Sequence, residues 1–221
     1  MIKYNIKTVN DWLYNSNPIK KLYYNGMVRY RRFVANGQPT PPSFDGKWKA
    51  TYQDGHVESA QCGSSSEIVQ NEINLSNLVS VEIGDCVTSI GDLAFDGCRS
   101  LSSITIPNSI TTIGSGGLSF TGLIDVVLPD SVTSIGNTAF YNCTSLTSIT
   151  IPNSVNSIDY GAFYNCTSLT SVTVQATTPP ALSDATTFDN TNNCPIYVPS
   201  QSVEAYKAAW SQYASRIQPI S

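Results

Sequence analysis

Apolar residues recur along the middle of the chain with a period of 22 or 23 residues. The repeated units open at Leu78, Leu101, Leu123, Leu146 and Leu169. Each complete unit follows the template L-x-x-I-x-I-P-x-x-V-x-x-I-G-x-x-A-F-x-x-C-x-x, whose first part alternates apolar and polar positions and so predicts a short strand. The template proline has no amide hydrogen and ends the strand. Because no unit can bury its apolar face alone, the repetition predicts a solenoid with one coil per unit.

Two units depart from the template. The second unit is one residue short, with SFTG after Leu118 where other units carry YNCTS, and we expect Phe120 to fill the volume of the template cysteine. A sixth, degraded unit is predicted at residues 195–199, because Ile196 and Val198 continue the strand pattern 24 residues after the fifth unit. Five or six rungs, spaced by roughly 4.8 Å, predict a parallel ladder about 25 Å long.

The segments before the repeats predict two hairpins. An Asn-Gly pair at residues 25–26 separates two β-rich runs in KLYYNGMVRYRRF, which indicates a type I′ turn. An Asp-Gly pair at residues 54–55 predicts a second hairpin in KWKATYQDGHVESAQC. Ser64 and Glu67 have the spacing of a capping box, which predicts a helix start. We expect the second hairpin and this helix to cover the first rung, since the open end of a repeat array exposes apolar side chains.

The end of the chain predicts a helix that covers the last rung. Val203, Tyr206, Trp210 and Tyr213 recur at intervals of three and four residues and mark one apolar helical face. A capping helix is the favoured interpretation, and an aromatic ligand platform is the alternative.

The stretch QPTPP is typical of a stiff linker. The predicted organisation is a basic β-hairpin module at 1–38, a linker at 39–42, an N-terminal cap at 43–77, repeats at 78–174, and a degraded repeat with a C-terminal cap at 175–221.

The template resembles that of a known family. Segments such as AFYNC at residues 139–143 and IPNSV at residues 151–155 closely resemble the BspA-like (Treponema-type) leucine-rich repeats found in surface proteins of Bacteroides relatives, spirochaetes and some protists. The resemblance covers about residues 78–174. It implies a mainly β fold, a right-handed leucine-rich-repeat solenoid. It also implies a non-enzymatic binding or adhesion module at a bacterial cell surface, without cofactors, whose ligand is a protein or a glycan.

Charge is unevenly distributed along the chain. Residues 1–60 carry nine Lys and Arg against four Asp and Glu, whereas residues 76–195 carry one Arg against nine Asp and Glu. The overall net charge of −4 argues against nucleic-acid binding, and the asymmetry suggests two different partners. On the first hairpin, Lys21, Arg29 and Arg31 form either a solvated basic face or a docking patch for an acidic partner.

The chain contains no apolar stretch approaching the 18 residues of a membrane span. Its first residues, MIKYNIKTVNDWLYN, also lack the apolar segment of a secretory signal. This conflicts with a surface location and favours an alternative interpretation, a phage or prophage structural component whose N-terminal module anchors the repeat arm. Oligomeric state and ligand identity do not follow from the sequence.

The six cysteines fall into two groups. Three share one template position and are predicted to be small buried residues rather than halves of disulfides: Cys98, Cys143 and Cys166. Three others lie off that column, and the sequence leaves their redox state open: Cys62, Cys86 and Cys194. None has the CxxC spacing of a zinc site.

Groups suited to catalysis are few. His56, the only histidine, follows the Asp-Gly pair of a predicted turn, which favours an exposed turn residue over a general base. The acidic residues, such as Asp125 and Asp159, are scattered, so no carboxylate pair is indicated. The run DNTNN at 189–193 is rich in oxygen atoms but lacks the glycine and distal glutamate of an EF-hand loop, which favours a loop over a calcium site. We therefore predict that the protein is not an enzyme.

The remaining candidate site is the exposed face of the strand ladder. The template positions between the inward strand residues carry mostly short hydroxyl side chains, including Ser103, Thr105, Thr147, Ser148 and Thr150. The third rung differs, because it places Ile124 and Val127 around Asp125. A rigid sheet with a small apolar and acidic spot can dock a protein loop or a sugar at little ordering cost. Drift in a tolerant surface is the alternative explanation for this spot.

Overall fold

The computed structural model of the chain describes residues 46–62, 66–69, 73, 75 and 77–220, and the backbone of three strands between residues 12 and 32. The chain divides into two compact units, residues 1–44 and residues 45–221. The first unit contains a three-stranded antiparallel sheet with the order β1 (Trp12–Tyr14), β2 (Asn17–Tyr24), β3 (Met27–Arg32). The predicted first hairpin is therefore present as β2 and β3, while its turn at 25–26 lies outside the described residues. Strand β1 was not predicted, because three residues are too few to show an alternating pattern.

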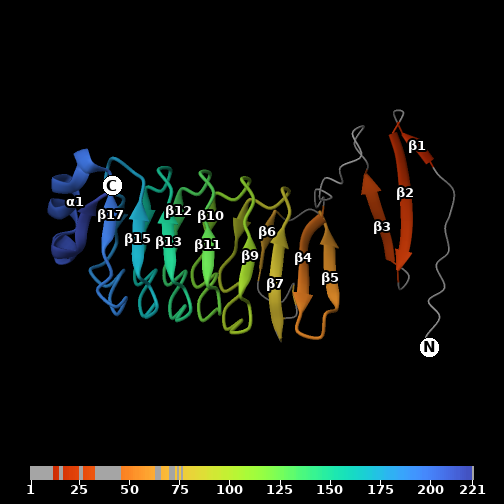
Figure 1. The fold of residues 1–221 in the computed structure, drawn as a ribbon, viewed down its shortest axis with the longest axis horizontal. Coiled ribbons are helices and arrows are strands. Elements are labelled where there is room, and N and C mark those ends of the chain that lie inside the picture. Colours follow the sequence, from red (N-terminus) through yellow and green to blue (C-terminus); the bar gives the residue numbers. More distant parts are fainter. Residues whose placement is uncertain are drawn as a thin grey trace. The chain divides into compact units, whose positions relative to one another are not determined.

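The second unit contains the predicted solenoid, and each repeat contributes one strand to a ladder of short parallel strands (Figure 1). These strands are β7 (Leu78–Ile83), β9 (Ser103–Thr105), β11 (Asp125–Val127), β13 (Ser148–Ile151), β15 (Ser171–Val174) and β17 (Ile196–Val198). The degraded sixth unit is confirmed as a rung, since Val172 lies opposite Ile196. The template leucines at the start of the units are fully buried.

A second sheet runs along the opposite side of the solenoid, with one two-residue strand per unit. Its order is β6 (Glu67–Ile68), β8 (Ser89–Ile90), β10 (Thr112–Ile113), β12 (Ser134–Ile135), β14 (Ser157–Ile158) and β16 (Ala181–Leu182). The helix start predicted at Ser64 and Glu67 is wrong, because Glu67 belongs to β6 and lies opposite Ser89. Ile68 is fully buried, and packing on the next rung outweighs the local capping preference.

The core lies between the two sheets and is built from columns of equivalent residues. Phe140, Phe163 and Phe188 stack with ring centroids 5.1 Å and 5.3 Å apart and nearly parallel planes. The isoleucines of the second sheet and the strand residues facing them are also buried. Full burial of each such side chain contributes about 1.5–3 kcal/mol, so stacking neighbouring units supplies what a single unit lacks.

The turn that carries the A-F-x-x-C segment requires two residues in the left-handed region. In four successive units these positions are Leu93 and Gly97, Gly116 and Phe120, Thr138 and Asn142, and Gly161 and Asn165, with φ between 52° and 77°. The prediction that Phe120 replaces the template cysteine is wrong, because Phe120 occupies the left-handed position of Asn142 and is partly exposed. Thr121 takes the cysteine position instead, buried and 3.2 Å from the Cys143 Sγ.

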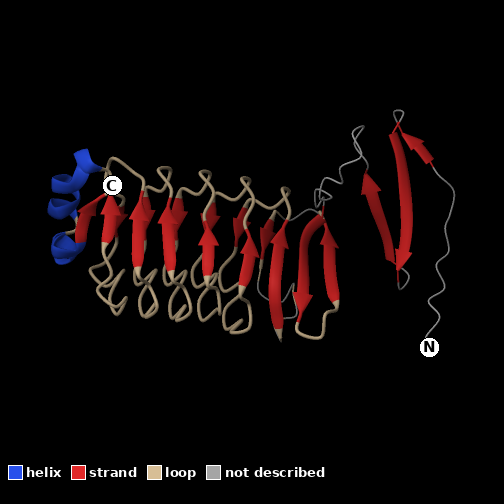
Figure 2. Cartoon of the chain, in the orientation of Figure 1, coloured by secondary structure: helices blue, strands red, loops and turns tan. Residues whose placement is uncertain are grey.

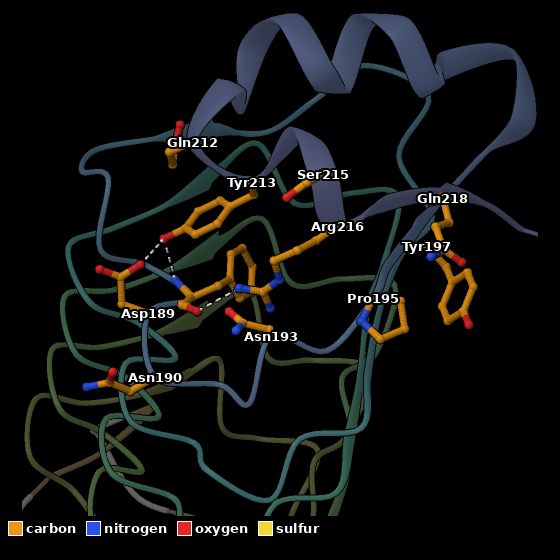
Figure 3. A pocket seen from close by; sticks show the side chains of 11 residues that line it. Asp189, Asn190, Asn193, Pro195, Tyr197, Gln212, Tyr213, Ser215, Arg216 and Gln218 are labelled. Carbon is orange, nitrogen blue, oxygen red and sulfur yellow. Dashed lines mark hydrogen bonds between the residues drawn. The ribbon is translucent and has the colours of Figure 1, made fainter.

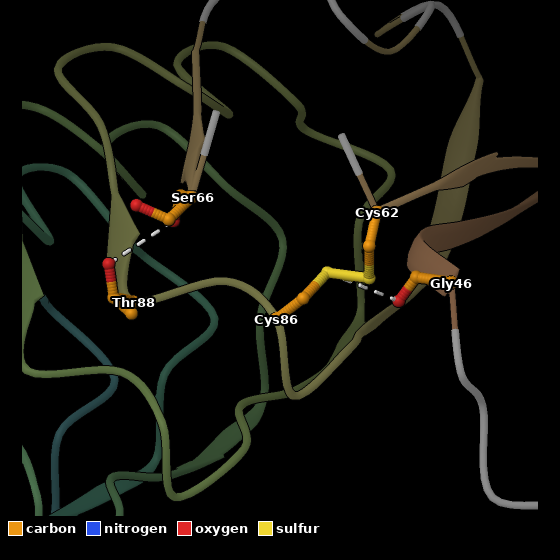
Figure 4. Close-up of a disulfide and its surroundings, with 5 residues drawn as sticks. All are labelled: Gly46, Cys62, Ser66, Cys86 and Thr88. Atoms are coloured by element: carbon orange, nitrogen blue, oxygen red, sulfur yellow. Dashed lines mark hydrogen bonds between the residues drawn. A yellow bond between two sulfur atoms is a disulfide. The ribbon is translucent and has the colours of Figure 1, made fainter. Parts of the chain in front are cut away.

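The N-terminal end of the solenoid is covered by the predicted second hairpin, β4 (Gly46–Tyr52) and β5 (Val57–Gln61). Strand β4 pairs antiparallel with β7, so the hairpin extends the ladder. Cys62, directly after β5, forms a disulfide with Cys86 in the turn that follows β7 (Figure 4). Nearby, the Thr88 amide donates to the Ser66 carbonyl over 2.7 Å and links β6 to the turn before β8. Of the three cysteines whose redox state the sequence left open, Cys62 and Cys86 are oxidised to a disulfide, while Cys194 is a free, buried thiol.

The C-terminal end is covered by helices, as predicted (Figure 2). A 3-10 turn (Ser200–Ser202) leads into α1 (Val203–Ala209), which continues into a second 3-10 segment (Ser211–Arg216). Tyr206, Trp210 and Tyr213 are buried, which confirms the predicted apolar face and its capping role. The chain then adds β18 (Ile217–Pro219), which pairs parallel with β17 and was not predicted.

Candidate functional site

The exposed face of the strand ladder is organised in two register rows. One row passes through Asp125, Ser148 and Ser171. The other passes through Val127, Thr150 and Thr173 and continues to Tyr197 and Gln218. Ser103 and Thr105 occupy the corresponding positions on β9 and are exposed. The structure therefore places six of the predicted strand-face residues in these rows, while Ile124 and Thr147 lie just before β11 and β13. It adds Tyr197, which the 24-residue offset from Thr173 indicates.

The ladder is interrupted next to the third rung. Strand β9 ends one sheet and β11 begins another, so no backbone pairing joins these two neighbouring strands. The interruption coincides with the short second unit, where Gly122 alone spans the step from Thr121 to the next template leucine. A Cβ atom at Gly122 would lie 2.2 Å from the Arg99 carbonyl oxygen, so the backbone passes too close for any other residue. The predicted spot on β11 thus lies at the edge of a continuous sheet.

Ile124, Asp125 and Val127 form the third-rung spot, the name used for these three residues below. Val127 is 80% exposed and Ile124 is 48% exposed. The Asp125 carboxylate accepts a hydrogen bond of 3.1 Å from the Thr147 hydroxyl, which also lies 3.2 Å from the Ile124 carbonyl oxygen. The neighbouring rung therefore orients the acidic group, with an apolar side chain on either side of it.

A polar hollow of about 740 Å³ lies at the C-terminal end of the ladder (Figure 3). Asp189 and Asn190 line one side and Tyr197 and Gln218 the other, with Asn193 between them. The loop 189–193 is part of this wall, and Asn190, Asn192 and Asn193 are all left-handed, with φ of 50° to 57°. We refer to this feature as the C-terminal hollow. It lies where the register row through Thr173 and Tyr197 ends.

The floor of the C-terminal hollow is held by Arg216 and Tyr213. Arg216 donates from Nε to the Cys194 carbonyl over 2.8 Å and from Nη1 to the Phe188 carbonyl over 3.0 Å, while its Nη2 lies 2.8 Å from the Thr191 Oγ1. The Tyr213 hydroxyl donates to the Ala185 carbonyl over 2.5 Å and accepts from the Phe188 amide over 2.9 Å. Burial raises the pKa of Tyr213, so its hydroxyl keeps the proton that it donates.

The other chemical groups singled out in the sequence are not brought together into a catalytic arrangement. His56 is exposed, stacks on Tyr52 with ring centroids 4.1 Å apart, and lies 2.5 Å from the Asp54 carboxylate. Asp159, directly after β14, accepts a hydrogen bond of 2.7 Å from Ser183, directly after β16, whereas Asp125 belongs to the strand ladder. Among the described residues, no group of three or more His, Cys, Asp or Glu could hold a metal ion.

The three residues of the cysteine column are buried. Burial and the nearby Asp96 raise the pKa of Cys98 to about 12. The hydrogen bond with Cys143, together with burial, holds the pKa of Cys166 well above its ordinary value. Both Cys143 and Cys166 lie 3.1 Å from backbone carbonyls of the preceding rung. These thiols link rungs, as small buried residues, and none of the three is positioned as a nucleophile.

The basic residues of the first unit are placed by the strand register. Lys21 lies opposite Tyr30, whereas Arg31 lies opposite Lys20 and Arg29 opposite Leu22. The docking patch of Lys21, Arg29 and Arg31 stays a prediction.

Comparison with known proteins identifies the repeats. Residues 66–195 match the family model of the BspA type leucine rich repeat region in six copies, which is more than half of the chain. The chain belongs to the BspA-type leucine-rich repeat family. The match begins before Leu78 and so includes β6, and it ends at the start of the degraded sixth unit. No curated protein matches the chain significantly.

Solved structures show the same fold as the BspA-type repeats of this chain. A leucine-rich cell surface protein from Faecalibacterium prausnitzii A2-165 is 24% identical, with a TM-score of 0.53 over 76% of this chain and 41% of the other. The pneumococcal vaccine antigen PcpA is 21% identical, with a TM-score of 0.58 over 78% of this chain and 48% of the other. This chain therefore spans less than half the length of either neighbour. None of the described helices is long and apolar enough to cross a membrane.

Proposed function

We propose that this BspA-type protein is a non-enzymatic binding module that acts outside the cytoplasm and docks a protein partner on its strand face. The observation that carries the proposal is the third-rung spot. The rungs β9, β13 and β15 each carry Ser and Thr at the two outward strand positions, while β11 carries Asp125 and Val127 there. An apolar side chain that is 80% exposed beside an oriented carboxylate has no role in stacking the repeats.

The chemistry of the spot favours a protein segment that presents an apolar side chain next to a Lys or Arg. Val127 and Ile124 offer apolar contact, and Asp125 offers a charge that Thr147 holds in place. Residues 76–195 carry one basic residue against nine acidic ones, so a basic partner is attracted at longer range as well. The backbone of the ladder is fixed by its pairing with β13, so binding costs little ordering of the site.

The proposed location rests on the disulfide and on the relatives. Disulfides persist in oxidising compartments and are rare in the cytosol, so the Cys62–Cys86 bond supports a protein exposed to the exterior. The Faecalibacterium neighbour is described as a cell surface protein, which agrees with this location. The alternative of a phage particle component rests on the N-terminal unit, and no feature of the described residues favours it.

The test introduces the same two residues, Lys and Ala, at the equivalent positions of two adjacent rungs. The full chain and two double variants, Asp125→Lys with Val127→Ala and Ser148→Lys with Thr150→Ala, are measured for binding to immobilised fibronectin, laminin and collagen. We expect the β11 variant to bind roughly tenfold more weakly, as for a central contact of an interface, and the β13 control to bind within about threefold of the wild type. The proposal would be overturned if the wild type and both variants bound equally well. It would also be overturned if the wild type bound none of the three immobilised proteins. Binding only to a glycan array would replace the protein partner with a sugar.

A further inference from the structure

The C-terminal hollow combines a fixed floor with free polar walls. Phe188 and Tyr213 are buried, and Arg216 is tied to the backbone of the loop that precedes β17. The surrounding side chains of Asn190, Asn193 and Gln218 are exposed and make no side-chain hydrogen bond to another described residue. Its volume of about 740 Å³ lies in the usual range of small-ligand sites, on the order of 300–1,000 Å³.

The walls select for a ligand with many hydroxyl groups. The side chains of Asn190, Asn193, Gln212 and Gln218 each present an amide that offers both donors and an acceptor. A hydroxyl group also donates and accepts, so an array of amides matches a polyol better than it matches a purely donating or accepting ligand. Tyr197 adds a half-buried aromatic ring beside Gln218. Such a ring offers an apolar surface to the C–H groups of a sugar.

The charges in the C-terminal hollow exclude an anion as the preferred ligand. Arg216 is the only cationic side chain among the lining residues, and three of its nitrogens already face Cys194, Phe188 and Thr191. Its guanidinium also lies 5.3 Å from the centre of the Tyr213 ring. Asp189 places a carboxylate at the wall, 3.2 Å from the Tyr213 hydroxyl, where it repels a negative ligand.

We infer that the C-terminal hollow is a binding site for a neutral saccharide. The site is separate from the third-rung spot, and it stands whether or not the strand face binds a protein. It assigns a role to the loop 189–193, whose side-chain oxygens the sequence alone left without one. The row from Thr173 through Tyr197 to Gln218 provides an exposed strip along which further sugar units of a longer glycan would extend.

The variant that tests this site removes two amides without changing the backbone conformation. Asn190 and Asn193 are left-handed, so Asn190→Gly with Asn193→Gly keeps the turn accessible while deleting both side chains. Asn192→Gly is the matched control, because Asn192 lies in the same loop with φ of 57° but does not line the C-terminal hollow.

The experiment measures binding of the full chain by saturation-transfer NMR and titration calorimetry. The probes are neutral oligosaccharides ending in galactose, mannose or N-acetylglucosamine, and sialyllactose serves as the anionic probe. We expect at least one neutral probe to bind, the double glycine variant to bind it at least about tenfold more weakly, and the Asn192→Gly variant to stay within about threefold of the wild type. Binding of sialyllactose alone would overturn the inference. The same holds if the neutral probe binds the double variant as tightly as the wild type, or if no neutral probe binds at millimolar concentration.

Discussion

The two ends of the solenoid are closed by different physical means. At the N-terminal end, an antiparallel hairpin extends the ladder and the Cys62–Cys86 disulfide ties that hairpin to the first repeat. At the C-terminal end, Tyr206, Trp210 and Tyr213 cover the last rung, and the described residues there contain no disulfide. One end therefore depends on the redox compartment and the other on aromatic packing. The difference ties the fold of this family member to an oxidising environment at one end only.

The C-terminal cap gains its strength from aromatic side chains that also use their polar atoms. The Trp210 ring lies 5.7 Å from the Phe188 ring, and its Nε1 donates to the Pro180 carbonyl over 3.0 Å. The Tyr206 hydroxyl donates to the Ala176 carbonyl over 2.7 Å. Each ring thus removes apolar area from water and satisfies a backbone carbonyl of the last repeats. The stack of phenylalanines that runs through the repeats ends on this cap.

The largest expected loss of stability follows from a substitution in the C-terminal cap. Trp210→Ala leaves a cavity against Phe188 and an unpaired Pro180 carbonyl, so we expect the free energy of unfolding to fall by about 3–5 kcal/mol. Urea unfolding followed by circular dichroism measures this loss. Tyr160→Ala is the control, because Tyr160 is 52% exposed, and it should change stability by less than about 0.5 kcal/mol. A similar loss in both variants would contradict the capping role of Trp210.

The second prediction concerns removal of the disulfide at the N-terminal end of the solenoid. Replacing Cys62 and Cys86 together by Ser releases a loop whose ends are separated by 24 residues, which we expect to lower the free energy of unfolding by about 3 kcal/mol. Adding dithiothreitol to the wild type should produce the same loss, and it should leave the double variant unchanged. A double variant as stable as the oxidised wild type would show that the disulfide does not hold this end.

A smaller effect sharpens the role of polar atoms in the C-terminal cap. Tyr213→Phe keeps the ring and removes the hydroxyl that serves the Ala185 carbonyl and the Phe188 amide, so we expect a loss of about 1–2 kcal/mol. Tyr197→Phe is the control, since the Tyr197 hydroxyl makes no hydrogen bond to another described residue. Urea unfolding of the two variants should separate them by at least about 1 kcal/mol. Equal stabilities would mean that the ring alone holds the cap.

The smallest expected effect is a response to alkali that is confined to the C-terminal end. Burial raises the pKa of both Tyr206 and Tyr213 above the ordinary tyrosine value of about 10. A pKa that is raised in the folded state contributes stability that is complete below the unfolded pKa and is lost as pH rises above it. We expect urea midpoints to fall as the pH rises above about 10, and to fall less when both tyrosines are replaced by Phe. An identical fall in the double variant would assign the response to other groups.

The periodic part of the fold could be predicted from the sequence because each rung repeats the same packing requirement. The ladder strands, the capping helix and the buried leucine, phenylalanine and cysteine columns follow from apolar spacing. The second hairpin follows from its Asp-Gly turn pair. The helix start at Ser64 and Glu67 was wrongly predicted because a two-residue strand such as β6 is too short to show an alternating pattern. Strand β6 forms through its pairing with β8, which local sequence does not reveal. The error at Phe120 has a similar cause, since the left-handed turn position is occupied by different residue types in successive units and so shows no recurring residue in the template.

The candidate sites differ in how far the sequence could identify them. The third-rung spot was predictable, because it breaks a repeated surface pattern at known template positions. The C-terminal hollow was not, because it brings the loop 189–193 together with Gln212 and Gln218 from the cap, and no local pattern predicts that closure. The Cys62–Cys86 pairing likewise needed the hairpin and the first repeat to be placed against each other.

Hydrogen exchange of the full chain, with and without dithiothreitol, tests most directly the claim that the two ends are closed by different means. We predict that reduction removes protection from the amides of β4, β5 and β7, while the amides of β15, β17 and α1 stay protected. Loss of protection at the C-terminal end to the same extent, or unchanged protection at the N-terminal end, would contradict this account of the molecule.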